Sequence, residues 1–252
     1  MPKIRADQLL VNLGLAPSKS AAQKLIDADR VRLPDGTAVR KPAQALDGHT
    51  QLILTKPLEY VSRGAHKLIP AIEQFKPILE GKTALDLGAS TGGFTDVLLK
   101  HGVNKVYAVD VGTDQLHPSL RSNPRVVNLQ QTNARFLDKS IVPDPIQILV
   151  ADVSFISLTK VLPPCNPLLA PDAWIAVLVK PQFETQREHI GKRGVVKDPE
   201  VRRQCLEKIL AFATAELNWK SLGTIPSPIL GPEGNQETIA VFTNQSPQEN
   251  KA

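Results

Sequence analysis

The chain has 252 residues and a formal net charge of +5, with 42% hydrophobic and 22% charged residues. This composition is ordinary for a soluble globular protein. Its two cysteines, Cys165 and Cys205, provide no disulfide framework and fit a reducing, cytoplasmic compartment. The polar start lacks the apolar core of a signal peptide, and no apolar run approaches the ~20 residues that cross a bilayer. We therefore expect neither an export signal nor a membrane span.

Most of the positive charge lies in the first quarter of the chain. Residues 1–56 hold nine Lys/Arg and five Asp/Glu, which accounts for +4 of the total. Phosphate binding needs such a local positive field, but a solvated basic face has the same composition. Charge alone leaves both interpretations open.

Residues 1–56 predict a small α+β domain. The pattern indicates helices over 7–13 and 18–26, the second with Ser18 or Ser20 near its N-cap, and then strands over 31–33 and 50–55. The stretches 18–26 and 30–33 resemble the S4 RNA-binding domain, in which the second helix and the following strand lie against structured RNA. That family usually has glycine where Asp29 stands, which leaves the local turn open. The resemblance implies that the basic residues of this unit contact RNA: Arg5, Lys19, Lys24, Arg30 and Arg32.

From Thr83 onward, strands and helices alternate along the chain. We expect strands at 83–88, 105–110, 126–130, 146–151, 174–180, 219–226 and 237–243, with helices at 93–101, 157–169 and 199–215. This order predicts an α/β fold with a Rossmann-like, seven-stranded and mostly parallel sheet. Because no helix separates the last two strands, one of them should be antiparallel. We expect 57–82 to be a linker with a helix over 65–75, 83–246 to be the second domain, and 247–252 to be a disordered tail.

A glycine-rich turn after the first of these strands predicts a nucleotide-like ligand. Residues 84–88 end a buried strand, and 89–93 turn tightly into a helix, where glycines let the backbone approach a ligand. The next strand ends in Asp110, whose carboxylate can accept hydrogen bonds from two ribose hydroxyls. Ser90 breaks the dinucleotide pattern, and no Gly-Lys-Ser/Thr follows for a P-loop. Asp86, two residues before the first glycine, favours the cationic methionine end of S-adenosylmethionine, with a purely structural turn as the alternative.

The run Asp-Leu-Gly-Ala-Ser-Thr-Gly-Gly-Phe at 86–94 resembles the first motif of the FtsJ-like methyltransferases, which are Rossmann-like class I enzymes. The resemblance implies donor contacts from the turn, from the end of the second strand and from the residues after the third and fourth strands. These candidates are Asp86, Gly88, Ala89, Ser90, Gly92, Gly93, Phe94, Asp110, Val111, Asn133 and Asp152. For Asn133, a helix cap is an equally good interpretation.

The residues beyond the fourth and fifth strands favour a hydroxyl as the methyl acceptor. Asp152 is not followed by the Pro-Pro-Tyr/Phe that accompanies methylation of exocyclic base amines. Carbon methylation needs a cysteine nucleophile, but Cys165 lies within or beyond the next helix, where packing is its simpler role. A hydroxyl needs a base or a cation that stabilises the alkoxide, and Lys180 closes the apolar fifth strand.

Lys67, Asp152, Lys180 and Glu237 resemble the Lys-Asp-Lys-Glu tetrad of 2′-O-ribose methyltransferases. The resemblance implies that Lys180 takes or stabilises the hydroxyl proton and Lys67 supports the alkoxide. Asp152 and Glu237 would hold both lysines in place. Taken alone, Lys67 is better explained as a solvated helix lysine. No metal is required, and the sequence has no cluster of His and Cys ligands.

Taken over nearly its whole length, the chain is similar to the TlyA family of hemolysin-A-type methyltransferases. The stretches 60–68, 86–94, 180–184, 191–199 and 231–237 carry this resemblance. It implies methylation of cytidine riboses in ribosomal RNA, with ribosomal subunits as partners. Arg63, Lys192 and Arg193 would add RNA contacts, although a disordered basic loop also explains 185–198. The alternatives are a non-catalytic RNA-binding or ribosome-assembly protein that binds the donor, a small-molecule methyltransferase, and a membrane-lytic hemolysin.

Overall fold

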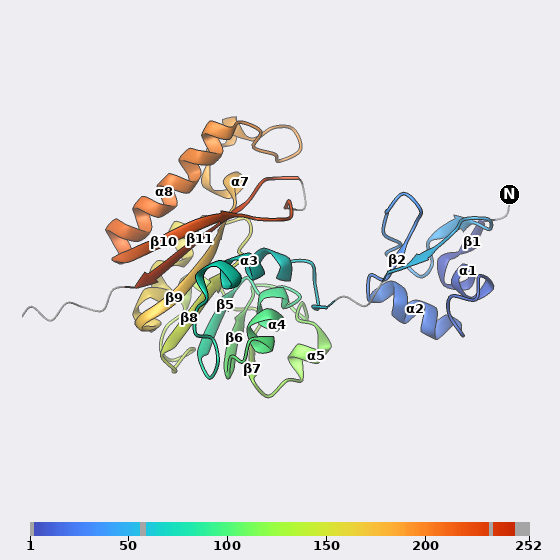
Figure 1. Ribbon diagram of the computed structural model, residues 1–252, viewed down its shortest axis with the longest axis horizontal. Helices are drawn as coiled ribbons and strands as arrows, with labels where there is room; N and C mark the ends of the chain where they lie inside the picture. Colours follow the sequence, from blue (N-terminus) through green and yellow to red (C-terminus); the bar gives the residue numbers. More distant parts are fainter. Residues whose placement is uncertain (1–2, 56–58, 232–233, 245–252) are drawn as a thin grey trace, which may run out of the picture. The chain divides into compact units, whose positions relative to one another are not determined.

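The computed structural model describes residues 3–55, 59–231 and 234–244. The chain forms two compact units, Met1–Glu59 and Tyr60–Ala252, and each unit has its own apolar core (Figure 1). Within the described ranges, no helix is long and apolar enough to cross a membrane. The predicted tail at 247–252 lies outside the described residues.

The first unit is a small α+β fold with two short antiparallel strand pairs, β1 with β3 and β2 with β4. Its elements are β1 (Lys3–Arg5), α1 (Ala6–Asn12), α2 (Lys19–Asp27), β2 (Val31–Arg32), β3 (Ala45–Asp47) and β4 (Ile53–Leu54). Ser18 is the N-cap of α2, and its Oγ accepts a hydrogen bond from the Ala21 amide at 3.2 Å. Both predicted helices are confirmed. The predicted strand over 50–55 is only two residues long, and β1 and β3 were not predicted.

The turn between α2 and β2 adopts the left-handed conformation that glycine favours. Asp29 has φ +53° and is one of the few residue types that tolerate this region. Its two carboxylate oxygens accept hydrogen bonds from the Arg32 guanidinium at 2.9 and 2.7 Å. The turn therefore keeps the glycine geometry, and the aspartate pairs with a basic side chain three residues later.

The second unit is built on a seven-stranded sheet in the order β10-β11-β9-β8-β5-β6-β7. The strands are β5 (Thr83–Leu87), β6 (Lys105–Val109), β7 (Val126–Leu129), β8 (Ile146–Ala151), β9 (Leu169–Val179), β10 (Trp219–Pro226) and β11 (Thr238–Asn244). β11 is antiparallel to both of its neighbours, β9 and β10. The predicted α/β class, strand number and single antiparallel strand are confirmed, although β9 begins five residues earlier than expected.

Helices cover both faces of this sheet, as Figure 1 shows. They are α3 (Ala65–Phe75), α4 (Gly93–Lys100), α5 (Pro118–Arg121), α6 (Leu158–Val161), α7 (Pro181–Glu184) and α8 (Pro199–Leu217), with 3₁₀ turns η1 (Ala134–Phe136), η2 (Pro163–Leu168) and η3 (Arg187–His189). α3 and α4 share one core with Ala84, whereas α6 and α8 share the other with Leu85. These two residues are neighbours on β5, so alternate side chains of a buried strand supply the two cores.

The predicted helix over 157–169 is wrong. The chain forms the short α6 and then η2, which contains Pro163, Pro164 and Pro167. Each proline lacks an amide hydrogen, and its ring collides with the preceding turn of an α-helix. The 3.6-residue apolar pattern therefore continues through a segment that cannot be one α-helix. Cys165 lies in η2 and is buried, as expected.

Candidate active site

The four residues of the predicted tetrad meet at one edge of the sheet. Lys67 lies on α3, Asp152 directly follows β8, Lys180 directly follows β9, and Glu237 directly precedes β11. Parallel strands bring their carboxyl ends to one edge, and an antiparallel strand brings its amino end there. In register, Thr238 of β11 pairs with Val179 of β9. This topology explains how residues 57 positions apart, Lys180 and Glu237, reach the same site.

These four side chains form a continuous row of ion pairs, which we call the charged tetrad. Glu237 Oε2 lies 2.8 Å from Lys67 Nζ, which lies 3.4 Å from Asp152 Oδ2. Asp152 Oδ1 in turn lies 2.5 Å from Lys180 Nζ. Asp152 therefore bridges the two lysines, whereas Glu237 forms its ion pair with Lys67. Lys67, Lys180 and Glu237 are buried and Asp152 is partly exposed, so the two positive and two negative charges compensate one another largely away from solvent.

Ser154 is a fifth polar group in the site, and the sequence analysis missed it. Its Oγ accepts a hydrogen bond from Lys180 Nζ at 2.9 Å. The side chain of Lys180 is therefore held by a carboxylate and a hydroxyl that lie two residues apart on the loop after β8. A serine two residues beyond a strand-end aspartate was the available signal, but serine is too common in loops to stand out.

Two cavities adjoin the charged tetrad, with volumes of about 370 and 190 Å³. Both are lined by Gly88, Ser90, Asp152 and Ser154, so the two cavities adjoin each other, and we refer to them as the joined cavities. The larger cavity also contains the predicted donor residues Asp110, Val111 and Asn133. The smaller one contains Asp86, Ala89, Gly93 and Phe94, together with Lys67 and Lys180. Of the predicted donor residues, Gly92 alone lines neither cavity.

Gly88 brings the ends of β5 and β8 together beneath this space. Its φ is +76°, and a Cβ at this position would lie 2.8 Å from the main-chain oxygen of Asp152. Any other residue would therefore push the loop after β8 away from the glycine turn. The approach of the two backbones places Asp152 at the floor of both cavities.

Main-chain amides fix Asp110 at the mouth of the larger cavity. Its two carboxylate oxygens accept hydrogen bonds from Ser90 N at 2.8 Å and Gly112 N at 2.7 Å. Asn133 caps η1, because its Oδ1 accepts a hydrogen bond from Arg135 N at 3.0 Å. Asn133 also lines the cavity, so the two roles considered for it coexist.

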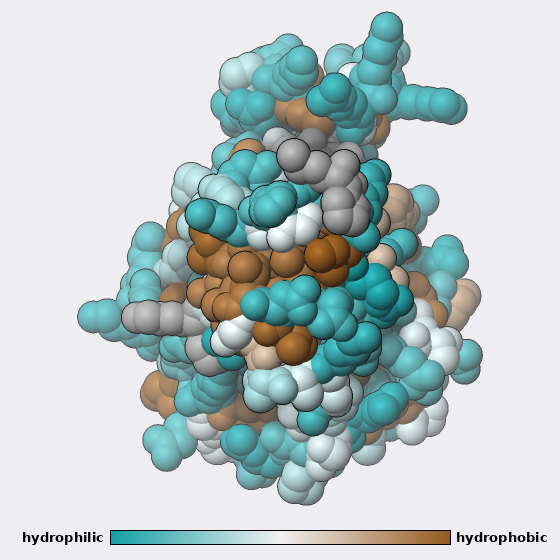
Figure 2. Space-filling model, turned by 90° about the vertical axis from the view of Figure 1, so that its right-hand side faces the viewer, coloured by the Kyte–Doolittle hydropathy of each residue, from teal (hydrophilic) through white to brown (hydrophobic). Residues whose placement is uncertain are grey.

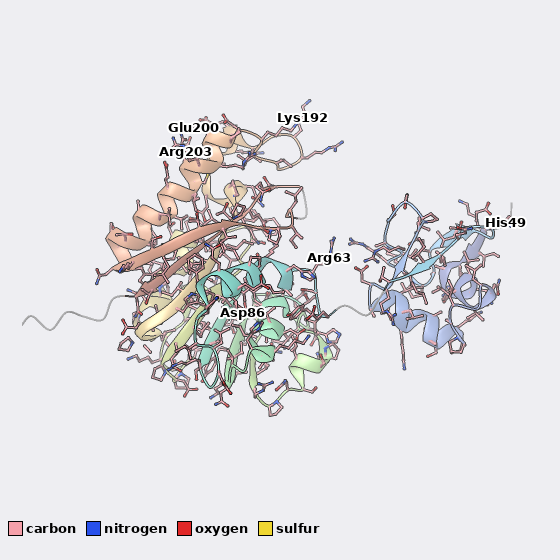
Figure 3. All side chains as sticks on the ribbon, in the orientation of Figure 1. His49, Arg63, Asp86, Lys192, Glu200 and Arg203 are labelled. Carbon is pink, nitrogen blue, oxygen red and sulfur yellow. The ribbon has the colours of Figure 1, made fainter. Side chains whose placement is uncertain are left out.

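Asp86 is a fully buried carboxyl group in the middle of the second unit, where Figure 3 labels it. Its Oδ2 accepts a hydrogen bond from Thr95 Oγ1 at 2.6 Å. Its Oδ1 has no hydrogen-bond partner among the residues that the structure describes. Burial raises the pKa of Asp86 to about 7, and the charges of Asp152 and Asp110 add to this effect. A cationic group in the smaller cavity would favour its ionised form.

A third hollow, of about 520 Å³, adjoins the larger cavity through Arg135, Phe155 and Ile156. The Phe155 side chain is 91% exposed, and its ring centroid lies 5.2 Å from that of Phe183. Lys180 Nζ lies 6.0 Å from the centroid of Phe183, so this aromatic pair stands beside the charged tetrad. Neither ring was predicted from the sequence. The only available signal for Phe155 was an aromatic residue shortly after a strand end; its φ of +63°, which is rare for such a residue, is visible only in the structure.

On the side that Figure 2 draws, apolar residues come to the surface among hydrophilic side chains. The exposed large apolar residues of the second unit include Val111, Phe136, Phe155 and Leu230. Val111 and Phe155 both line the larger cavity. Exposed apolar side chains at the mouth of a pocket indicate a surface that is used for binding.

The predicted RNA contacts differ in whether their basic side chains already have partners within the protein. The three candidate arginines of the first unit have internal partners: Arg5 pairs with Asp7, Arg32 pairs with Asp29, and the Arg30 guanidinium donates to the main-chain oxygen of Thr55. The remaining candidates are exposed, and Figure 3 labels two of them at the surface of the second unit, Arg63 and Lys192. These exposed candidates are Lys19, Lys24, Arg63, Lys192 and Arg193.

Comparison with known proteins identifies the family. Residues 4–52 match the S4 domain, and residues 60–244 match the FtsJ-like methyltransferases. The 16S/23S rRNA (cytidine-2′-O)-methyltransferase TlyA of Mycobacterium tuberculosis is 47% identical over 97% of this chain and 91% of that protein. The chain belongs to the TlyA family. The predicted S4, FtsJ-like and TlyA resemblances, and with them the methyltransferase class, are confirmed.

Two further relatives show how names vary within the TlyA family. Hemolysin A of Brachyspira hyodysenteriae is 39% identical over 95% of this chain and 99% of that protein. A solved structure from Streptococcus thermophilus, provisionally named a hemolysin, is 38% identical and covers 98% of this chain and 90% of that chain with a TM-score of 0.75. The TlyA fold thus occurs under both enzyme and hemolysin names.

Proposed function

We propose that this protein transfers the methyl group of S-adenosylmethionine to a ribose 2′-hydroxyl of ribosomal RNA, with cytidine as the target nucleoside. The charged tetrad carries the proposal, because Asp152 lines both cavities and the two lysines, Lys67 and Lys180, line the smaller one. The TlyA relative from Mycobacterium tuberculosis is named for this reaction. Ribosomal RNA or a ribosomal subunit in the cytoplasm is then the macromolecular partner.

The joined cavities fit the donor in two parts. Asp110 offers a fixed carboxylate to the ribose hydroxyls in the larger cavity, next to Asn133 and Val111. The free Oδ1 of Asp86 offers a counter-charge to the methionine ammonium in the smaller cavity. When bound, S-adenosylmethionine supplies a methyl group that its sulfonium already activates, so the protein mainly supplies position and charge.

Lys180 acts on the acceptor hydroxyl. Its side-chain nitrogen is held between Asp152 and Ser154, which fixes Nζ in the lining of the smaller cavity. As a neutral amine, Nζ accepts the hydroxyl proton; as an ammonium group, it instead stabilises the negative charge that develops on the oxygen. Lys67, anchored by Glu237 at 2.8 Å, adds a second buried positive charge on the other side of Asp152. Asp152 keeps the two ammonium groups apart and aligned.

The third hollow receives the acceptor nucleoside. Single-stranded nucleotides are commonly bound by stacking on aromatic side chains and by basic groups around them. Phe155 and Phe183 provide the rings, and Arg135 and Lys160 provide positive charge in the same lining. A base in this hollow would bring its ribose to Lys180, which already lies against Phe183.

The test is a methyl-transfer assay on ribosomal RNA with wild-type protein and with Lys180→Ala. The variant should lose turnover by at least a thousandfold, while its dissociation constant for S-adenosylmethionine, measured by titration calorimetry, stays within threefold. Lys220→Ala, an exposed lysine on β10, serves as the matched control and should keep full activity. Mapping of ribose methylation should then place the product at cytidine 2′-oxygens. Wild-type turnover by Lys180→Ala would overturn the proposed role of this lysine.

A further inference from the structure

Asn235 is a buried amide that belongs neither to the charged tetrad nor to the cavities beside it. It is 1% exposed and lies two residues before Glu237. Its Oδ1 accepts a hydrogen bond from Val196 N at 2.9 Å, and its Nδ2 donates one to Gly194 O at 2.8 Å. Both partners lie in the segment between α7 and α8, about 40 residues earlier in the chain. One side chain therefore ties two distant segments together through their main chains.

The segment tied by Asn235 is an ordered loop with a basic tip, residues 185–198, which we call the basic loop. Main-chain hydrogen bonds from Gly194 N to Gly191 O and from Gly191 N to Val195 O close a tight turn. Lys192 and Arg193 stand exposed on this turn, and Figure 3 shows Lys192 projecting away from the molecule. Over its whole length the loop has four Lys/Arg and two Asp/Glu.

The base of the basic loop is anchored to the second unit at two more points. Val196 is fully buried and packs with Ile190, Val201 and Cys205. The Arg202 guanidinium on α8 donates hydrogen bonds to the main-chain oxygens of Val196 and Lys197 at 3.2 and 2.9 Å. Asn235 anchors the basic loop to the chain just before β11, because it forms hydrogen bonds with Gly194 and Val196 at the end of the tight turn. Without it, the basic tip would lose its fixed position relative to the start of β11.

The same stretch of chain encloses Glu237. Gly231 N donates a hydrogen bond to Asn235 O at 2.9 Å, which holds Gly231 beside the residues that precede Glu237. A Cβ at Gly231 would lie 2.5 Å from Glu237 Oε1, so this backbone lies directly against the carboxylate. Asn235 therefore joins the basic loop to the part of the backbone that surrounds one end of the charged tetrad.

We infer that Asn235 is a positioning residue for RNA: it fixes the basic loop at the edge of the charged tetrad, where Lys192 and Arg193 hold the phosphates of the strand being methylated. This inference rests on the proposed function. A loop that is already ordered gives up less conformational entropy when it binds, so fixing it favours RNA binding. Contacts to phosphate release counterions, and they make the affinity fall with salt in proportion to their number.

The test is a double-mutant cycle with RNA binding as its readout. Filter binding of purified ribosomal RNA is measured against salt concentration for wild type, Asn235→Ala, Lys192→Ala with Arg193→Ala, and all three substitutions together. Asn235→Ala should weaken RNA binding about tenfold and flatten the slope of log affinity against log salt by about 0.7–0.9, which corresponds to the loss of one phosphate contact. Its kcat at saturating RNA should stay within twofold of wild type, and so should its dissociation constant for the donor.

Because Asn235 acts through the basic tip, the triple variant should bind RNA no more weakly than the Lys192/Arg193 variant. Additive losses would show that Asn235 acts independently of the tip. A fall in kcat with unchanged RNA affinity and salt slope would show that Asn235 serves Glu237 instead, and either result overturns the inference. Asn235→Asp, which keeps the acceptor for Val196 N and loses the donor to Gly194 O, supplies the comparison if Asn235→Ala folds poorly. Because binding is read without methyl transfer, a wild-type protein that binds but does not methylate this RNA would refute the proposed function alone.

Discussion

Replacing Glu237 by glutamine should reduce stability and activity together, and the additional removal of Lys67 should restore only stability. The two charges are 2.8 Å apart, and their side chains are 0% and 8% exposed. At an effective dielectric constant of about 20, their gross attraction is about 6 kcal/mol. Removing one partner of a buried pair leaves the other charge desolvated, at a cost of about 3–5 kcal/mol.

We expect the lower end of this range for Glu237→Gln, about 3 kcal/mol, because Asp152 still lies 3.4 Å from Lys67 Nζ. For a unit of this size, the loss lowers Tm by about 6–12 °C. The double variant Lys67→Met with Glu237→Gln has no unpaired charge at this end of the charged tetrad, so its Tm should recover to within a few degrees of wild type. Thermal unfolding and methyl-transfer assays on the single and double variants check this. A double variant whose destabilisation equals the sum of the single effects would refute the reasoning.

Three further predictions concern ligand binding. Burial raises the pKa of Asp86 to about 7, and only its ionised form attracts the donor ammonium, so the affinity for S-adenosylmethionine should rise about tenfold from pH 6 to pH 8. In the free protein, the raised pKa of Asp86 contributes most to the stability of the fold below about pH 4, and this contribution is lost as the pH rises through 7. Asp86→Asn should abolish both pH dependences, that of donor affinity and that of stability. Titration calorimetry and thermal unfolding across this pH range check this, and a dependence that persists in the variant would contradict it. Asp110→Asn should weaken donor binding at least tenfold in the same calorimetric assay, because the ribose loses a charged acceptor; unchanged affinity would place the ribose elsewhere. Asp29→Gly should keep the left-handed turn and free Arg32 from its pairing with Asp29. RNA affinity should then rise, and the slope of log affinity against log salt should steepen by about 1. If filter binding shows neither change, Arg32 does not contact RNA.

Strand-end residues made the core of the site predictable from the sequence. Asp152 and Lys180 close apolar strands, and parallel strands carry such residues to one edge. Lys67 and Glu237 were added through the resemblance to the tetrad of 2′-O-ribose methyltransferases, because neither residue stands out from the sequence pattern alone. The individual ion pairs were not predictable, since the pairing of Glu237 with Lys67 depends on side-chain directions that a linear pattern does not contain.

The predictions that were wrong or missing also have specific physical causes. Pro163, Pro164 and Pro167 interrupt a segment whose apolar spacing imitates a helix, so periodicity was the weaker signal there. The exposure of Phe155 follows from its backbone angle and from the hollow beneath it, neither of which sequence spacing encodes. The internal partners of Arg30 and Arg32 were hidden for a similar reason. Counting basic residues measures charge but not whether that charge is already compensated.

The position of β11 has a consequence for the timing of activity during protein synthesis. This strand is the last of the sheet to be made, yet it inserts between β9 and β10, which precede it in the chain. Glu237 enters the charged tetrad with it. A growing chain that has completed β5 to β10 therefore holds a glycine turn and both lysines but lacks the carboxylate that anchors Lys67. The sheet and the charged tetrad are therefore completed together, only after β11 has been made.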